Sequence, residues 1–437
     1  MARRGRRHSR EEEPVKKKKK RAGRRNATRM TLSAIMLFEG TACLLLVLRG
    51  NPFDWTAIML GLLPLMAWVS VLFLAKRLKA DAMLVMLMSF LCGLGVILLY
   101  GLSPERGLRH MWIVLGGMLM FSVCAMAIRV MKDWRGICWF LIVAGVALLL
   151  LPVAIGQETF GAKNWIIIPL IGSFQPSELV KIFLLLILAQ FFSSLRGIKG
   201  MLPGLLFAVA CLATLMLQKD LGTALMYYLV TLLMYWAASS NLPLTLLGGV
   251  GGVGAAIMGY QMFAHVKTRV AIWRNPWSDA LGTGYQLVQA LTAIGSGGLF
   301  GLGLGMGKSR AIPAYSTDFI FAVLCEQLGI LFGLCVVGLY VIIVMRGLAI
   351  SLQARTSFHS LLALGCSLLI GLQTFVIIGG VIKLIPLTGI TLPFLSYGGT
   401  SLVSCMGIMG LLCGVAAQNA EDREADERMA EEREALP

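Results

Sequence analysis

Long apolar runs recur along the whole chain and constrain its fold more than any other feature of the sequence. The hydrocarbon core of a bilayer is about 30 Å thick, so a helix needs about 20 apolar residues to cross it. About twelve runs approach this length, and short polar breaks separate them. Because lipid offers no hydrogen-bond partner to the edge of a sheet, runs of this kind form helices. We therefore predict an all-α integral membrane protein, built as a multi-span helical bundle.

The predicted spans cover most of the chain. They are residues 31–48, 56–75, 82–100, 112–130, 137–155, 178–192, 202–217, 221–238, 242–263, 319–345, 358–382 and 402–417. The composition agrees with this prediction, because 57% of the residues are hydrophobic and only 14% are charged, whereas about 25% are charged in a typical soluble domain.

The net charge of +17 is distributed unevenly along the chain. Nine Arg and five Lys against three Glu precede Met30, so most of the excess lies in one low-complexity tail ahead of the first apolar run. A basic tail next to a membrane span is typical of a cytoplasmic anchor that touches anionic lipid. We therefore expect membrane partners and no nucleic acid.

Basic residues in the short loops set the expected orientation. They fall in alternate loops, on the same side as the basic tail, at Lys76, Arg77, Lys79, Arg129, Lys132, Arg135, Arg196, Lys199, Arg346 and Arg355. The positive-inside rule then makes both termini cytoplasmic and places the protein in a cytoplasmic membrane as a multi-pass chain. The long basic loop 264–317 is expected outside, because long loops are translocated largely regardless of charge.

Four charged residues begin predicted spans, where ionisable groups are costly and therefore informative. Glu178 and Lys181 begin one span, three residues apart and so on one helix face. Asp220 begins another span and Asp318 begins a third. The expected topology places all four near the outer surface, beside the basic loop. This arrangement suits a site for a negatively charged amphiphile.

Helix capping is the alternative role for the three acids, because a side-chain oxygen at a helix start accepts hydrogen bonds from free N–H groups. Lys181 is harder to explain as part of a cap, since a cation near a helix N-terminus opposes the helix dipole. It needs a local anion, which is either Glu178 or a bound phosphate.

Several motifs, in order along the chain, carry a resemblance to a known family. They are Gly161-Ala162-Lys163-Asn164-Trp165, Gln175-Pro176-Ser177-Glu178 with Lys181, Asp220-Leu221-Gly222-Thr223, Tyr285-Gln286 with Gln289, Gly295-Ser296-Gly297-Gly298, Thr317-Asp318-Phe319-Ile320-Phe321-Ala322 and Thr391-Leu392-Pro393-Phe394-Leu395-Ser396-Tyr397-Gly398-Gly399. They resemble the SEDS family of shape, elongation, division and sporulation proteins, which includes FtsW, RodA and SpoVE.

The resemblance implies a ten-span core that polymerises lipid II into glycan strands at the outer face of the cytoplasmic membrane. It also implies a class B penicillin-binding protein as the transpeptidase partner. The chain then divides into a basic tail (1–30), two extra spans (31–81), a SEDS-like core (82–418) and a charged cytoplasmic tail (419–437). The role in elongation, division or sporulation stays open.

The resemblance further implies that the aspartate matching Asp318 is essential for polymerisation. Glu178, Lys181 and Asp220 match other functional positions of the family's outer cavity, and Trp165, Gln289 and Ser396 lie within the matching motifs as supporting residues. The chain departs from the family pattern at Asn164 (usually Arg), at Lys219 (usually Pro), and at Ala314 and Ser316, where the family commonly has Glu and His.

The chemistry of lipid II fits these residues. Its sugar is carried on a pyrophosphate, which leaves unprotonated once cations neutralise its charge, so one base is enough. We expect Asp318 to be that base and the reaction to release undecaprenyl pyrophosphate with inversion. The candidate cations are Lys181, Arg269, Arg274, Lys308 and Arg310. Glu178 and Asp220 are expected to orient Lys181 or to bind a divalent cation such as Mg²⁺ or Mn²⁺.

A lipid II flippase is the rival interpretation, because many spans and intramembrane charges also suit a transporter. Transport sites, however, lie near the membrane midplane in broken helices, whereas these charges are expected near one surface. A purely structural scaffold is a third interpretation, and it leaves Asp318 and Lys181 without a role.

Overall fold

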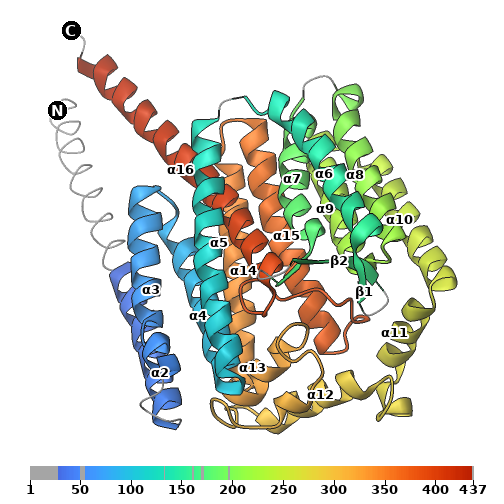
Figure 1. Cartoon of the computed structure of the whole chain (residues 1–437). Coiled ribbons are helices and arrows are strands. Elements are labelled where there is room, and N and C mark those ends of the chain that lie inside the picture. Colours follow the sequence, from blue (N-terminus) through green and yellow to red (C-terminus); the bar gives the residue numbers. More distant parts are fainter. Residues whose placement is uncertain are drawn as a thin grey trace, which may run out of the picture.

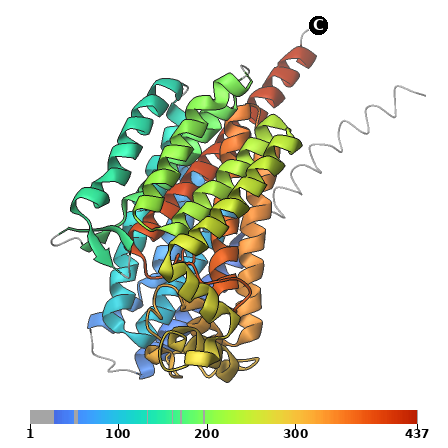
Figure 2. The same cartoon turned by 90° about the vertical axis from the view of Figure 1, so that its right-hand side faces the viewer.

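The computed structural model describes residues 28–49, 55–131, 133–159, 162–168, 172–194 and 197–435. These residues form a bundle of long helices (Figures 1 and 2). Ten helices of the described part are long and apolar enough to cross a membrane. The predicted multi-span helical membrane protein is thereby confirmed. The expected basic tail falls mainly on residues 1–27 and, like Lys132 and Arg196, lies outside the described residues.

The first candidate span is the helix Thr28–Arg49. The others are α4 (Ala82–Leu102), α5 (Pro104–Val130), α6 (Arg135–Ile155), α8 (Ile198–Leu217), α9 (Leu221–Ser239), α10 (Leu242–Met262), α14 (Ile330–Leu352), α15 (Ser357–Val381) and α16 (Gly399–Ala435). The shorter helix α7 (Pro176–Phe192) has 17 residues and is largely buried, packed against α6, α8, α9, α15 and α16.

Two of the predicted spans are broken in the structure. The second consists of α2 (Trp55–Leu60), α3 (Leu63–Ser70) and the π-helix η1 (Val71–Arg77). The predicted span 319–345 is divided into α13 (Ile320–Leu328) and α14 at Gly329, where φ is +88°. A β-carbon at this position would lie 2.2 Å from the Leu299 carbonyl oxygen, so only glycine fits the break.

A small sheet follows α6 and adds to the predicted helical fold. It is an antiparallel meander of β1 (Gln157–Thr159), β2 (Ala162–Ile168) and β3 (Gly172–Phe174). Ile166 pairs with Phe174 and Ile168 pairs with Gly172. The strands lie in the apolar segment between α6 and α7, and β2 contacts both helices.

The end of the bundle opposite the C-terminus carries the long loop 264–317, and we call it the loop end (Figures 1 and 2). The loop folds into α11 (Ala264–Arg274), α12 (Tyr285–Gly297) and two short 3₁₀ turns, η2 (Pro276–Asp279) and η3 (Ser309–Ala311). The start of α7, the start of α9 and α13 lie at the same end, which brings the predicted site residues into one half of the molecule.

The opposite end, which we call the tail end, gathers basic residues from the short loops. Glu421, in the second half of α16, pairs with Lys79 at 3.3 Å and with Arg129 at 2.6 Å. Arg355 pairs with Asp426 on the same helix. The charged segment after residue 418 is therefore a continuation of α16 that binds the basic loops.

The tail end also contains a capped helix start that joins two spans. Asp81 caps α4 by accepting hydrogen bonds from the Met83 and Leu84 amides at 3.0 and 3.3 Å. Its Oδ2 accepts from Arg346 Nε and Nη2 of α14 at 3.0 and 2.6 Å. One carboxylate thus fixes the start of α4 and ties it to α14.

We expect Asp81→Ala to lower the free energy of unfolding by about 2 kcal/mol, because it removes a cap and leaves Arg346 without its anion. Asp81→Asn should cost less, since asparagine caps as well as aspartate. Reversible unfolding in mixed detergent micelles measures both changes. Equal losses for the two variants would mean that the cap contributes nothing.

Candidate functional site

Asp318 and Arg269 both lie close to Gly389 at the loop end. A β-carbon placed on Gly389 would lie 3.4 Å from Arg269 Nη2 and 3.7 Å from Asp318 Oδ2. Gly389 has φ of +77°, a conformation that disfavours any other residue. Arg269, on α11, also donates from Nη1 to the Thr388 carbonyl at 2.7 Å. The segment 388–389 therefore sets the arginine beside the carboxylate.

The backbone on the N-terminal side of Asp318 is held by the segment that precedes α16. Ser396 Oγ donates to the Thr317 carbonyl at 2.6 Å and accepts from the Leu392 amide at 2.9 Å. The Tyr397 amide donates to the Ser316 carbonyl at 2.8 Å. Ser396 thus acts as a positioning residue for Asp318.

The half-buried environment changes the acidity of both groups. Burial raises the pKa of Asp318 from 3.8 to about 6, although the hydroxyl of Thr317 and the charge of Arg269 oppose the rise. Burial lowers the pKa of Arg269, while Asp318 and Asp220 hold it up. A carboxylate with a pKa near 6 is mostly ionised at neutral pH and is a stronger base than an exposed aspartate.

Asp220 is fixed by four donors. It caps α9 by accepting from the Thr223 amide at 3.1 Å and from the Thr223 hydroxyl at 3.0 Å. Its Oδ2 also accepts from Asn164 Nδ2 at 2.8 Å and from Gln175 Nε2 at 3.0 Å. The carboxylate therefore joins β2, the start of α7 and the start of α9, which confirms its capping role and gives it a second role as a junction.

Glu178 and Lys181 form a buried pair inside the bundle. Lys181 Nζ donates to Glu178 Oε1 at 2.8 Å, with side-chain exposures of 1% for the lysine and 8% for the glutamate. Ser404 Oγ on α16 donates to Glu178 Oε2 at 2.8 Å, and Gln373 Oε1 on α15 lies 3.5 Å from Lys181 Nζ. The predicted contact within the pair is present. The predicted alternative for Lys181, a bound phosphate, conflicts with its enclosure, and Asp220 does not orient it.

The remaining predicted residues lie on other elements or on the surface. Trp165 on β2 and Gln289 on α12 are half-buried. Arg274, Lys308 and Arg310 are exposed on the loop end. Among the candidate cations, Arg269 is the one that the described structure brings next to Asp318.

Glu326 holds the segment before Asp318 in place. It was not among the residues predicted from the sequence. It is buried in α13, where Oε1 accepts from the Lys308 amide at 2.9 Å and Oε2 accepts from the Ser309 amide at 3.0 Å. Gly307, with φ of +98°, has no space for a β-carbon beside this carboxylate. An acid inside an apolar run was the signal that could have revealed it.

The carboxylates do not fit the expected divalent cation. Both oxygens of Glu178 are used by Lys181 and Ser404, and Asp220 receives the four donors described above. Within the described residues, no group of three or more His, Cys, Asp or Glu side chains converges. Glu178 and Asp220 are therefore committed to contacts within the bundle.

Comparisons with known proteins decide the family of this chain. Residues 82–421 match the family described as "Cell cycle protein" that comprises FtsW, RodA and SpoVE. The chain belongs to this family. The match includes every residue of the site described above and ends shortly before the last turns of α16.

The relatives differ in how much of the chain they cover. Peptidoglycan glycosyltransferase RodA of Mycobacterium tuberculosis (strain CDC 1551 / Oshkosh) is 31% identical, over 93% of this chain and 94% of that protein. Stage V sporulation protein E of Bacillus subtilis (strain 168) is 33% identical, over 78% of this chain and 98% of its own length. Because it covers 93% of this chain, the mycobacterial match includes part of the segment before α4.

Two solved structures are also similar. One, described as "Structural coordination of polymerization and crosslinking by a peptidoglycan synthase complex", has a chain with a TM-score of 0.66 and 26% identity, covering 78% of this chain and 98% of that one. The Rod shape determining protein RodA of Thermus thermophilus has a TM-score of 0.57 and 26% identity, with coverage of 77% and 96%.

The buried pair makes a stability prediction. Glu178→Gln removes the anion and leaves Lys181 enclosed and uncompensated, so we expect a loss of about 3–5 kcal/mol in the free energy of unfolding. The double variant Glu178→Gln with Lys181→Met should recover most of this loss, because no buried charge remains. Unfolding curves of both variants provide the measurement, and equal losses would show that the pair is not coupled.

Proposed function

We propose that this chain is a peptidoglycan glycosyltransferase that polymerises lipid II into glycan strands. The observation that carries the proposal is the proximity of a half-buried aspartate of raised pKa, Asp318, to Arg269 at the loop end. The names of the mycobacterial and Bacillus relatives and of the solved synthase complex support it.

Asp318 is the general base of the proposed reaction. Its carboxylate takes the proton of the acceptor sugar hydroxyl, and that oxygen attacks the anomeric carbon of the donor sugar. The bond from the sugar to the lipid pyrophosphate breaks, and the pyrophosphate leaves with both electrons of that bond. A base with a pKa near 6 suits proton transfer at neutral pH.

Arg269 is the cation that holds the pyrophosphate. Its guanidinium lies beside Asp318 and is only half-buried, so an anionic headgroup reaches it from the loop end. Arg274, Lys308 and Arg310 are exposed on the same end and add long-range attraction for the headgroup. Lys181, enclosed with Glu178, serves the architecture of the site and has no direct contact with the substrate in this proposal.

The loop end faces outward in this proposal, and both termini are cytoplasmic. The support is the gathering of Lys79, Arg129 and Arg355 with the acidic turns of α16 at the tail end, because basic loops stay inside. The partner is a class B penicillin-binding protein that crosslinks the new strands, in line with the coordination of polymerisation and crosslinking named for the solved complex.

Asp318→Asn tests the base. Asparagine keeps the size of the side chain but has no basic carboxylate, so lipid II polymerisation by the chain reconstituted with its partner should fall about 10²- to 10⁴-fold. In the unaltered chain the rate should also fall as the pH drops through about 6, because protonated Asp318 accepts no proton. Near-normal synthesis by Asp318→Asn would refute the assignment.

Asp220→Asn is the matched control for this experiment. It also replaces a carboxylate by an amide at the loop end and preserves the cap of α9. It should reduce the rate less than Asp318→Asn and leave the pH profile in place. A larger loss from Asp220→Asn would move the role of base to Asp220.

Labelling of introduced cysteines tests the orientation. Leu281, between α11 and α12, is 92% exposed at the loop end, and Gln353, at the C-terminus of α14, is exposed at the tail end. In intact cells, a membrane-impermeant maleimide should label Leu281→Cys and spare Gln353→Cys, because only the loop end faces outward. The reverse pattern would place the site on the cytoplasmic side.

A further inference from the structure

A glutamate with no counter-charge among the described residues is buried in the helix Thr28–Arg49, outside the residues that match the family. Glu39 is 0% exposed, and within the described part of the chain neither of its carboxyl oxygens has a hydrogen-bond partner. An ionised carboxylate in this setting is very unfavourable, because neither water nor a cation stabilises it. This residue has no part in the site at the loop end.

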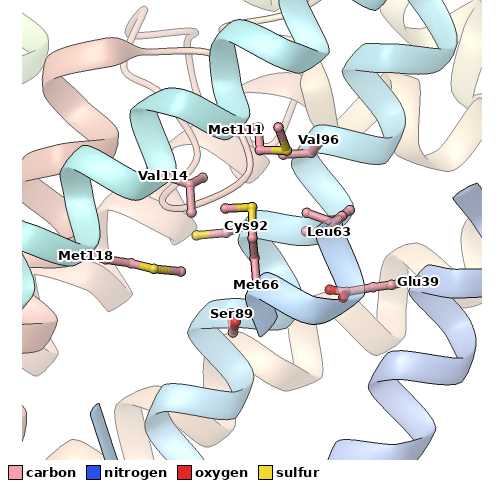
Figure 3. A pocket seen from close by; sticks show the side chains of 10 residues that line it. Glu39, Leu63, Met66, Ser89, Cys92, Val96, Met111, Val114 and Met118 are labelled. Atoms are coloured by element: carbon pink, nitrogen blue, oxygen red, sulfur yellow. The ribbon is translucent and has the colours of Figure 1, made fainter. Parts of the chain in front are cut away.

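The carboxyl of Glu39 packs against α4 in a small cavity at Gly93, which we call the seat. A β-carbon on Gly93 would lie 2.1 Å from Glu39 Oε1, so only glycine leaves room for the acid. Ser89 and Cys92 line the same narrow cavity, which has space for about one water molecule. Figure 3 shows Glu39 reaching from its own helix toward Ser89 and Met66. Ser89 is in turn hydrogen-bonded to Ser70 of α3 at 3.0 Å.

The described surroundings of Glu39 supply no positive charge. Its cavity is lined by Ser89, Gly93 and seven hydrophobic or sulfur-containing side chains, and no Lys, Arg or His is among these lining residues. The titratable neighbours are the thiols of Cys92 and of Cys43, one turn along the same helix, and neither carries positive charge. A proton is therefore the cation available to the carboxyl.

Three further contacts fix the same helix to the core. The Phe38 ring stacks on Phe332 of α14 with centroids 5.7 Å apart and meets Phe90 of α4 edge-on at 5.5 Å. Arg49 Nη1 donates to the Leu304 carbonyl at 2.8 Å, at the loop end. The next residue, Gly305, donates its amide to Gln327 Oε1, which holds this segment in place. The helix is thus docked from its middle to its C-terminus.

We propose that Glu39, held in its protonated form in the seat formed by Ser89, Cys92 and Gly93, is the docking residue that fixes the N-terminal helices to the core. The partner surface is the face of α4 at Gly93. The docked helices include residues 28–49 and α2, α3 and η1, and through Arg49 they support the segment that precedes Asp318.

The first test compares Glu39→Gln with the unaltered chain across pH. The folded chain retains a proton that an exposed glutamate in the unfolded chain releases above about pH 4.3. The unaltered chain should therefore lose stability relative to Glu39→Gln as pH rises, by about tenfold in the folding equilibrium constant per pH unit. Glu105→Gln, at an exposed glutamate of α5, controls for the loss of one carboxylate. A pH-independent difference for Glu39→Gln would overturn the proposal.

The second test examines the seat. Gly93→Ala should lower the folding equilibrium constant far more than Gly116→Ala, because a β-carbon on Gly116 meets nothing within 4 Å. Combining Gly93→Ala with Glu39→Ala should restore part of the loss, since the smaller side chain vacates the contested space. Additive effects of the two substitutions would show that Glu39 and Gly93 do not act as a docking pair.

Discussion

The ion pair between Lys181 and Glu178 is the interaction on which the architecture of the site depends. A charge enclosed in a membrane bundle requires its partner, so α7 holds both ends of the pair and recruits Ser404 of α16 and Gln373 of α15. Gln373 Nε2 donates to the Thr391 carbonyl at 2.8 Å. The segment that begins there contains Ser396, which holds the carbonyl next to Asp318.

This arrangement separates an enclosed ion pair from the charged groups at the loop end. The enclosed pair of Lys181 and Glu178 on α7 contacts Gln373 of α15 and Ser404 of α16, so it joins three helices. Asp318 and Arg269 lie at the loop end, where both are half-buried and burial raises the pKa of the acid. Asp220 lies between the two kinds, because it is held by Asn164, Gln175 and Thr223 and still contributes its charge to Arg269.

The sequence predicted the membrane class, most of the helices and the residues Asp318, Glu178, Lys181 and Asp220, since the cost of burying charge marks such positions. Apart from the contact between Glu178 and Lys181, it did not predict which of them lie together. Arg269 and Asp318 come together only through Gly389, more than a hundred residues from the arginine in the chain. Lys181 was expected beside either Glu178 or a phosphate, and in the described structure it is enclosed by three helices with Glu178 as its anion.

What the sequence determined by itself is local: apolar length requires spans, a glycine or proline permits a break, and an acid at a helix start caps it. Tertiary structure decided the rest. The break at Gly329 exists because the Leu299 carbonyl occupies the adjacent space, and Glu326 is useful because the amides of Lys308 and Ser309 arrive beside it. Such contacts join segments distant in sequence, so spacing and composition carry no signal for them, and only the packing of the whole bundle specifies where they form.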